Sequence, residues 1–252
     1  MVPRTLSDAA AVVTGHTRGL GEAIAAHLLS RGVRVLGIAR HRNAELVARY
    51  GDALTQVELD LADPAVLAAW LQSEVLGRFL GRAQTALLVN NAGVVQPVGP
   101  LETQDIDTTV RAVVLNVAAP LVLSAAFVAA TPDARDRRIL HLSSGAGRKA
   151  YRGWSVYCAT KAALDHHARA VALDRTPALR ISSVAPGVID TDMQAEIRAT
   201  TDRNFPDRQR FVAMKREGQL LTPDRAGGAV VEFLLSDAFG AEPATDLRSA
   251  GL

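Results

Sequence analysis

Short apolar runs alternate with longer segments of helical periodicity along most of the chain. Apolar residues recur at helical spacing within 19–31, and helical segments also cover 64–79 and 155–174. Six runs have the length and composition of strands buried on both faces: 10–15, 33–39, 54–60, 85–91, 137–144 and 179–187. Alternating strands and helices produce a parallel sheet covered by helices on both faces. We predict one doubly wound α/β domain over residues 1–252.

Residues 191–222 interrupt this alternation. They are polar, with TDRNFPDRQR in the middle, and they precede a last helix at 223–235. Ligands of open α/β sheets bind beyond the carboxyl ends of the strands, where a long segment after the sixth strand would lie. We therefore predict that 191–222 form an insertion that covers the substrate as a lid.

The stretch at 112–130, AVVLNVAAPLVLSAAFVAA, is almost uncharged and nearly long enough to span a bilayer. Asn116 and Pro120 interrupt it, alanine outnumbers leucine, and no polybasic flank sets an orientation. We favour a buried helix that packs on the sheet, with a partner subunit as a further contact. A membrane span is the alternative.

Charge and cysteine content narrow the classes of function. The net charge is only +2, and no basic tract of the kind that binds nucleic acid is present in the sequence. The single cysteine, Cys158, excludes an internal disulfide and a clustered-thiolate metal site. The first residues lack the features of a secretory signal. We expect a cytoplasmic enzyme without a metal ion, a nucleic-acid partner or a membrane partner.

A glycine-rich turn, TGHTRGLG, follows the first strand and opens the first helix. Glycine allows positive φ and a close backbone approach, and a helix N-terminus presents free N–H groups to a phosphate. An ordinary tight strand-to-helix turn is the alternative. We predict that a dinucleotide binds here, through Gly15, Thr17, Arg18, Gly19, Leu20 and Gly21.

The residues after the second strand indicate which dinucleotide binds. An acidic residue there would bind a ribose diol, but this chain has Arg40. Arg40 and Arg18 converging on one spot would suit a 2′-phosphate, which predicts NADP(H). The alternative is that Arg40 and Arg42 are solvated charges. Asp60 is expected to accept from the adenine amino group, and Asn91, Ala92 and Gly93 to let the backbone pass close to the adenosine ribose.

Tyr157 and Lys161 are the candidate catalytic residues. They stand one turn apart on one face of a predicted helix. The chain has three lysines and 25 arginines, so a lysine at 161 indicates a need for a cation with a tunable pKa. We predict that Tyr157 donates a proton to a carbonyl oxygen as general acid, and that Lys161, together with the positive nicotinamide of the oxidised cofactor, lowers the pKa of the phenol toward the working pH.

Two polar residues complete the predicted chemistry. Ser144, after the fifth strand, is placed to hydrogen-bond the substrate oxygen. Asn116 is an amide in an apolar helix, and we expect it to hold a water in a proton relay toward Lys161. Taken alone, Asn116 is better interpreted as a locally satisfied core amide. Tyr151, Trp154 and Met193 flank the site and either wall an apolar substrate pocket or pack as ordinary core residues.

These segments together resemble the short-chain dehydrogenase/reductase superfamily. The resemblance rests on TGHTRGLG, NNAG, Asn116, Ser144, YCATK and PGVIDTDM, in order along essentially the whole chain. It implies a Rossmann-like sheet of about seven strands, an Asn–Ser–Tyr–Lys catalytic set and a homodimer through the apolar helix and the helix at Tyr157. It also implies cofactor contacts from Leu61, Pro186, Gly187, Val188, Thr191 and Met193.

Within the superfamily the chain is most similar to the sepiapterin reductase and benzil reductase branch. RGWSVYC, DTDMQ, EGQL and the closing Phe239 and Asp246 carry this similarity. In sepiapterin reductases an acidic residue near the C-terminus anchors the pterin, which suggests Asp246, although the stretch between Phe239 and Asp246 differs. The family's glycine-rich tail is missing, so a homodimer is expected and a tetramer is the alternative.

The leading hypothesis is an NADPH-dependent reductase of a small ketone, an α-diketone or a pterin side-chain ketone. A catalytically idle protein that senses NADP(H) or serves as a scaffold is the second. The intact Asn–Ser–Tyr–Lys set weighs against it. The third is an NAD(P)-dependent dehydrogenase that oxidises a sugar or steroid alcohol, against which Arg18 and Arg40 weigh.

Overall fold

The computed structural model describes residue 6 and residues 8–248 and contains a parallel sheet of seven strands. The order across the sheet is β3-β2-β1-β4-β5-β6-β7. The order in which strands are added therefore reverses between β1 and β4, and the connection from β3 to β4 crosses back to the middle of the sheet. The strands are β1 (Ala9–Thr14), β2 (Arg34–Ala39), β3 (Leu54–Glu58), β4 (Thr85–Asn90), β5 (Asp136–Leu142), β6 (Leu179–Ala185) and β7 (Ala244–Asp246). The predicted doubly wound parallel sheet is confirmed.

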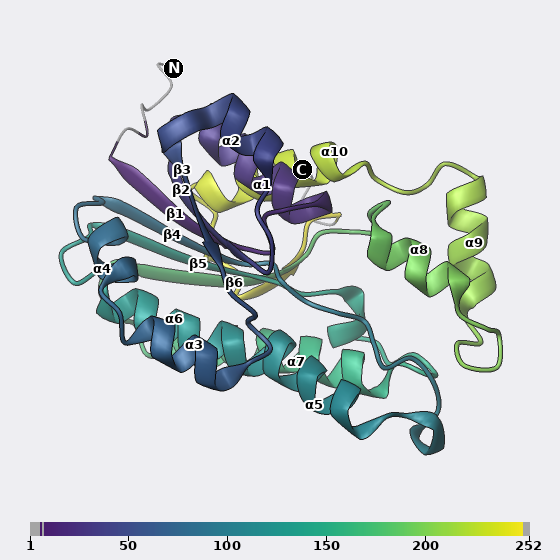
Figure 1. The fold of residues 1–252 in the computed structure, drawn as a ribbon. Helices are drawn as coiled ribbons and strands as arrows, with labels where there is room; N and C mark the ends of the chain where they lie inside the picture. Colours follow the sequence, from purple (N-terminus) through teal and green to yellow (C-terminus); the bar gives the residue numbers. More distant parts are fainter. Residues whose placement is uncertain (1–5, 7, 249–252) are drawn as a thin grey trace.

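Helices cover both faces of this sheet (Figure 1). One face carries α1, α2 and α10, and the other carries α3 to α7. The helices are α1 (Gly19–Ser30), α2 (Ala44–Tyr50), α3 (Pro64–Leu71), α4 (Val75–Leu80), α5 (Ile106–Val113), α6 (Ala119–Ala129), α7 (Ser155–Leu173), α8 (Asp192–Ala199), α9 (Arg208–Arg216) and α10 (Pro223–Leu235). The helix expected over 64–79 is therefore two helices. The first one ends at Leu71, and just beyond it the Ser73 hydroxyl donates to the carbonyl oxygen of Trp70 at 2.6 Å.

Neighbouring residues of the central strands face two different cores. Val13 belongs to the cluster under α1 and α10, while Val12 belongs to the cluster under α3, α6 and α7. Both residues are 0% exposed. The continuous apolar runs of the sequence arise because each strand is buried on both faces.

Nearly all of the apolar stretch at 112–130 lies in one 24-residue helical segment, Ile106–Ala129. In this segment a π-helical turn (Val114–Ala118) joins α5 to α6. Leu123 and Phe127 of α6 are at most 1% exposed and pack toward the sheet. The expected packing on the sheet is confirmed. By length and a mean hydropathy of 2.2 the segment also meets the criterion for a membrane span, which core helices of soluble proteins pass as well.

The segment at 191–222 contains α8 and α9, which lie together beyond the end of the sheet (Figure 1). An aromatic cluster attaches it to the domain. Phe205 stacks on Trp154 with ring centroids 4.3 Å apart and an interplanar angle of 10°, and Phe211 lies 5.6 Å from the same indole. The insertion is therefore packed on the segment that begins α7, and its role as a lid stays a prediction.

Candidate active site

A cleft of about 1170 Å³ runs along the carboxyl ends of the strands. This is where an open α/β sheet binds its ligands. With one exception, Asn116, the predicted site residues all line it: Gly15, Thr17, Arg18, Gly19, Leu20, Gly21, Arg40, Asp60, Leu61, Asn91, Ala92, Gly93, Ser144, Tyr151, Trp154, Tyr157, Lys161, Pro186, Gly187, Val188, Thr191, Met193 and Asp246. The fold thus brings together residues that are up to 231 positions apart (15 to 246) in the sequence.

The glycine turn is built from backbone at close range. Gly15 and Gly19 have φ values of 69° and 57°, in the left-handed region that favours glycine. A Cβ atom on Gly21 would lie 2.1 Å from the carbonyl oxygen of Gly15 and 2.4 Å from Nδ2 of Asn91. That amide donates to the carbonyl oxygens of Thr14 and Gly15, at 2.9 and 3.3 Å. The turn therefore tolerates no side chain at Gly21.

The N-terminus of α1 opens into the cleft beside this turn. The cap residue Arg18 makes no side-chain capping hydrogen bond. The first N–H groups of a helix have no partner within it, and the helix dipole favours an anion there. The residues present therefore fit the pyrophosphate of a dinucleotide, as the sequence predicts.

The two arginines expected to share a 2′-phosphate both line the cleft, but they differ in their partners. Arg18 donates to Asp192 Oδ2 of α8 at 2.7 Å, so its contact with a phosphate would replace this ion pair and stays a prediction. Both side chains are more than 70% exposed, and an exposed ion pair contributes about 0–1 kcal/mol. Arg40 is exposed and forms no ion pair with a carboxylate in the described part of the chain. Arg40 therefore remains the candidate phosphate ligand.

Asp60 is committed to protein partners at the adenine end of the cleft. Its Oδ2 accepts from Arg111 at 2.9 Å, and its Oδ1 accepts from the backbone N–H of Ala62 at 2.9 Å. Although burial raises the pKa of this carboxyl, these hydrogen bonds and the charges of Arg111 and Arg40 bring it below its usual value. Asp60 is therefore ionised, and contact with an adenine amino group would be shared with Arg111.

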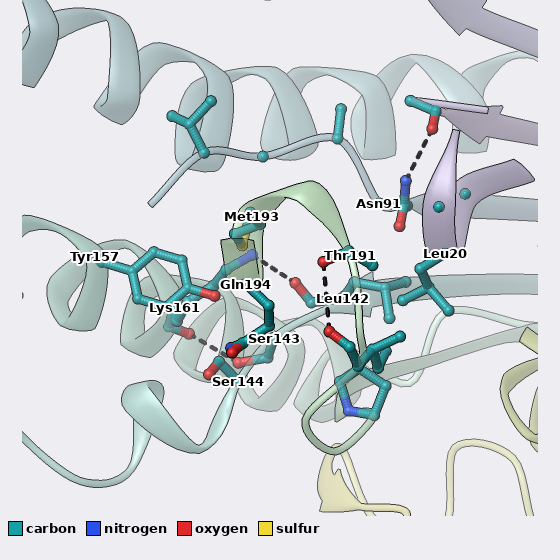
Figure 2. A pocket seen from close by; sticks show the side chains of 18 of the residues that line it. Leu20, Asn91, Leu142, Ser143, Ser144, Tyr157, Lys161, Thr191, Met193 and Gln194 are labelled. Carbon is teal, nitrogen blue, oxygen red and sulfur yellow. Dashed lines mark hydrogen bonds between the residues drawn. The ribbon is translucent and has the colours of Figure 1, made fainter. Parts of the chain in front are cut away.

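Tyr157 and Lys161 lie at the floor of the cleft on the first turns of α7 (Figure 2). They are only 8% and 5% exposed. The Nζ atom of Lys161 donates to the carbonyl oxygen of Leu142, at the end of β5, at 2.7 Å. The same atom lies 5.7 Å from the centroid of the Tyr157 ring. The end of β5 therefore fixes the cation beside the phenol.

Burial dominates the protonation of both groups. It raises the pKa of Tyr157 to about 12, against a lowering hydrogen bond with Ser144. It lowers the pKa of Lys161 to about 8, against the raising charge of Asp165. Among the chain's own groups desolvation outweighs the lowering contributions, and the expected lowering by Lys161 together with a bound oxidised nicotinamide stays a prediction. At neutral pH Tyr157 holds its proton, which is the form that a general acid needs.

Asn116 lies behind the cleft wall, in the π-helical turn between α5 and α6. Its Oδ1 accepts from the backbone N–H of Val94 at 2.9 Å, and its Nδ2 donates to the Val94 carbonyl at 2.8 Å and to Thr160 Oγ1 at 3.2 Å. The amide is therefore satisfied by protein groups and ties the loop after β4 to α7. The expected water relay stays a prediction.

The substrate end is formed by side chains from distant parts of the chain. Trp154 is 4% exposed and makes an edge contact with Tyr157, with ring centroids 5.4 Å apart. It is chiefly a packing residue that orients the phenol. Tyr151, 5.3 Å from the same indole, and Met193 are partly exposed. They remain candidates for contact with a substrate.

Asp246 reaches the cleft from β7, but its carboxylate is held by Arg248. Arg248 donates from Nε to Oδ1 at 2.9 Å and from Nη2 to Oδ2 at 2.6 Å. The pair, together with the charge of Arg148, lowers the pKa of Asp246. A pterin bound to Asp246 would therefore compete with Arg248.

Sequence reasoning missed Gln194, Phe211 and Arg248 as residues of the cleft, and for Arg148 it left open whether the side chain steers an anionic substrate or faces solvent. Arg148 donates to Asp165 of α7 at 3.0 Å and to the Thr245 carbonyl of β7 at 2.9 Å, so it fixes the strand that carries Asp246. Arginines are so common in this chain that composition gives no signal for Arg248. Gln194 directly follows Met193, and only the folded chain shows that it is buried.

Comparison with known proteins assigns the family. Residues 9–202 match the short chain dehydrogenase family. Over 235 residues the chain is 35% identical to the benzil reductase ((S)-benzoin forming) of Bacillus cereus, covering 90% of this chain and 94% of that one. It is 32% identical to the sepiapterin reductase of Meriones unguiculatus, covering 93% and 94% of the two chains. The chain belongs to the short-chain dehydrogenase/reductase family, in the branch of these two reductases, and is an oxidoreductase of that family.

Solved structures agree with this assignment. A short-chain dehydrogenase/reductase from Burkholderia vietnamiensis is 51% identical and superposes with a TM-score of 0.71, covering 96% of this chain and 98% of that one. A short chain dehydrogenase from Burkholderia cenocepacia, solved in complex with NADP, is 25% identical with a TM-score of 0.78 and covers 96% of each chain. Members of the family bind a nicotinamide cofactor, and the cleft described above has the residues to do so.

Proposed function

We propose that this protein reduces the carbonyl group of a small ketone or α-diketone to an alcohol, with NADPH as the hydride donor. The observation that carries the proposal is the joint position of Tyr157, Ser144 and Lys161 at the floor of the cleft. The similarity to benzil reductase and sepiapterin reductase supports the substrate class. A pterin side-chain ketone is the less favoured substrate, because Arg248 occupies Asp246.

Each residue has a defined task in this chemistry. When bound, NADPH supplies the hydride that adds to the carbonyl carbon. Ser144 donates a hydrogen bond to the carbonyl oxygen, and Tyr157 transfers its phenolic proton to that oxygen as negative charge develops. Lys161, held on the Leu142 carbonyl, stabilises the phenolate left behind. Asn116 keeps the loop after β4 against α7 and acts as a positioning residue.

Arg40 supports NADPH over NADH. It lines the cleft after β2, where a ribose-binding carboxylate is replaced by a cation. A guanidinium suits the oxygens of a 2′-phosphate. The Burkholderia cenocepacia relative was solved with NADP, which is consistent with this choice.

Replacing Tyr157 by Phe tests the function. The change removes the proton donor and keeps the ring that packs on Trp154. We expect the rate of benzil reduction with NADPH to fall by about 10²–10⁴-fold, the usual contribution of a general acid. The affinity for NADPH, measured by fluorescence titration, should stay within about threefold. A Tyr157→Phe enzyme that still turns over at the wild-type rate would refute the mechanism.

The same site could also run toward oxidation of an alcohol. The same phenol would act as the base in that direction, because the group that donates a proton in reduction takes it back in oxidation. A protein that only senses NADP(H) would have no use for the buried Tyr157–Lys161 pair. Initial rates in both directions with NADP(H) and NAD(H) separate these three functions.

We further propose that the protein forms a homodimer through α5, α6 and α7. Large apolar side chains are exposed on these helices: Val110, Val113, Val122 and Leu173. An exposed apolar surface of this kind commonly marks a protein interface. Analytical ultracentrifugation should give twice the 26.7 kDa mass of the chain. Charged substitutions at Val113 and Val122 should then produce monomers.

A further inference from the structure

Gln194 is a buried polar residue on the wall of the cleft. It lies in the first turn of α8 and is 9% exposed. Its Oε1 atom is shielded from solvent and has no hydrogen-bond partner within residues 6 and 8–248. An unpaired amide oxygen destabilises the folded state relative to an apolar side chain of the same size. A bound molecule that donates a hydrogen bond to this amide would remove the cost.

The amide is directed toward the reacting groups. Figure 2 shows the Gln194 side chain pointing into the cleft, toward Ser144 and Tyr157. Its neighbour Met193 packs on the aromatic cluster that contains Trp154 and Tyr157, so this turn of α8 is anchored beside the catalytic floor. A substrate whose carbonyl oxygen contacts Ser144 and Tyr157 would therefore extend toward Gln194.

We propose that Gln194 binds a second oxygen atom of the substrate, on the carbon next to the carbonyl that is reduced. The substrate class is then a vicinal diketone or an α-hydroxy ketone. A hydroxyl group would donate to Oε1, and a half-turn of the amide would let Nε2 donate to a second carbonyl oxygen. This inference rests on the proposed carbonyl reduction and specifies which carbonyl compounds the site selects.

Two ketones with the same carbon skeleton test the proposal. Benzil carries two adjacent carbonyl groups, and deoxybenzoin carries the same two phenyl rings with one. In Gln194→Met, kcat/KM for benzil with NADPH should fall by about three- to tenfold, the range for one neutral hydrogen bond. For deoxybenzoin it should change by less than about twofold. Comparing both enzymes on both ketones cancels the higher intrinsic reactivity of benzil.

Two controls separate this role from a structural one. Gln219→Met replaces an exposed glutamine of the same insertion and should leave both ketones unaffected. Because Gln194→Met removes an unpaired buried oxygen, its melting temperature should be equal to or above that of the wild type. Gln194→Leu provides a second apolar variant.

Equal losses of kcat/KM for both ketones in Gln194→Met and Gln194→Leu would overturn the role assigned to Gln194, and so would an unchanged kcat/KM for benzil. The proposed reduction would still stand, because the wild type would still turn over benzil. A wild-type enzyme that reduces neither ketone would overturn the proposed function and this inference with it.

Discussion

The two ends of the cleft are built in different ways. At the cofactor end the main chain forms the surface, and the closest approaches are between backbone atoms. Gly21 has no room for a Cβ atom because the Gly15 carbonyl oxygen would lie 2.1 Å from it. This end is formed chiefly by β1, α1 and the loop after β4. The parallel pairing of β1 with β4 fixes the position of that loop beside the glycine turn.

At the substrate end, side chains form the surface. Trp154, Phe205 and Phe211 pack as one aromatic cluster, although the first precedes α7 and the other two belong to the insertion. Arg148 joins this region to β7, and Arg248 holds Asp246. One substitution can change a side-chain surface without disturbing the sheet, whereas the glycine turn allows almost none. We therefore expect the cofactor end to tolerate few substitutions, and substitutions at the substrate end to change which substrate is bound.

The largest effect in this comparison is expected at the cofactor end. Arg40→Asp replaces the candidate phosphate ligand by a carboxylate, whose negative charge repels the phosphate. The value of kcat/KM for NADPH should therefore fall by about 10–100-fold more than that for NADH. Steady-state kinetics with both cofactors measure the ratio. Arg42→Asp is the matched control, because Arg42 already pairs with Glu58 at 2.8 Å. Equal losses with both cofactors in Arg40→Asp would show that Arg40 does not bind the phosphate.

A smaller and graded effect is expected at the floor that joins the two ends. Burial lowers the pKa of Lys161 to about 8, so the ammonium is present below that pH and is lost as the pH rises through it. Reduction needs the charged form, so kcat/KM measured at limiting NADPH should fall about tenfold per unit above pH 8. In Lys161→Arg the guanidinium stays charged, and the fall near pH 8 should disappear from whatever activity remains. A flat wild-type profile up to pH 10 would contradict the assigned role of Lys161.

The smallest effect is expected from Asp246→Asn at the substrate end. Arg248 already holds this carboxylate, and both groups are partly solvated. The rates with benzil and with sepiapterin should therefore change together, by less than about threefold. A selective loss with sepiapterin would show instead that Asp246 anchors a pterin, and that the substrate end is more specialised than its packing indicates.

Much of the site follows from local sequence. Strand–helix alternation predicts the parallel sheet, and the glycine spacing after β1 predicts the phosphate turn. The four-residue spacing of Tyr157 and Lys161 predicts one helical face. Each of these depends on contacts within a few residues or on the register of a buried sheet. The structure accordingly places them where the sequence indicates.

Local patterns leave the long-range contacts of the site open. Arg18 pairs with Asp192, 174 residues away, and Asn116 bonds to Val94 and Thr160 from a π-helical turn that periodicity does not reveal. The pKa of Tyr157 moves upward because desolvation outweighs its neighbours, and desolvation depends on the whole fold. The sequence alone indicates which polar groups belong to the site, but not which distant residues form their hydrogen bonds and ion pairs.

By itself, then, the sequence determined the fold class, the glycine turn after the first strand and the types of side chain that the helix at Tyr157 brings to the cleft. These features are encoded by residue type at short spacing, through backbone conformation and helical geometry. Only the tertiary structure decided which charges are paired, which aromatic rings are packed and that the amide oxygen of Gln194 is buried without a partner among the described residues. Those outcomes depend on which distant side chains meet, since burial and Coulomb energies are set by surroundings that no local pattern contains.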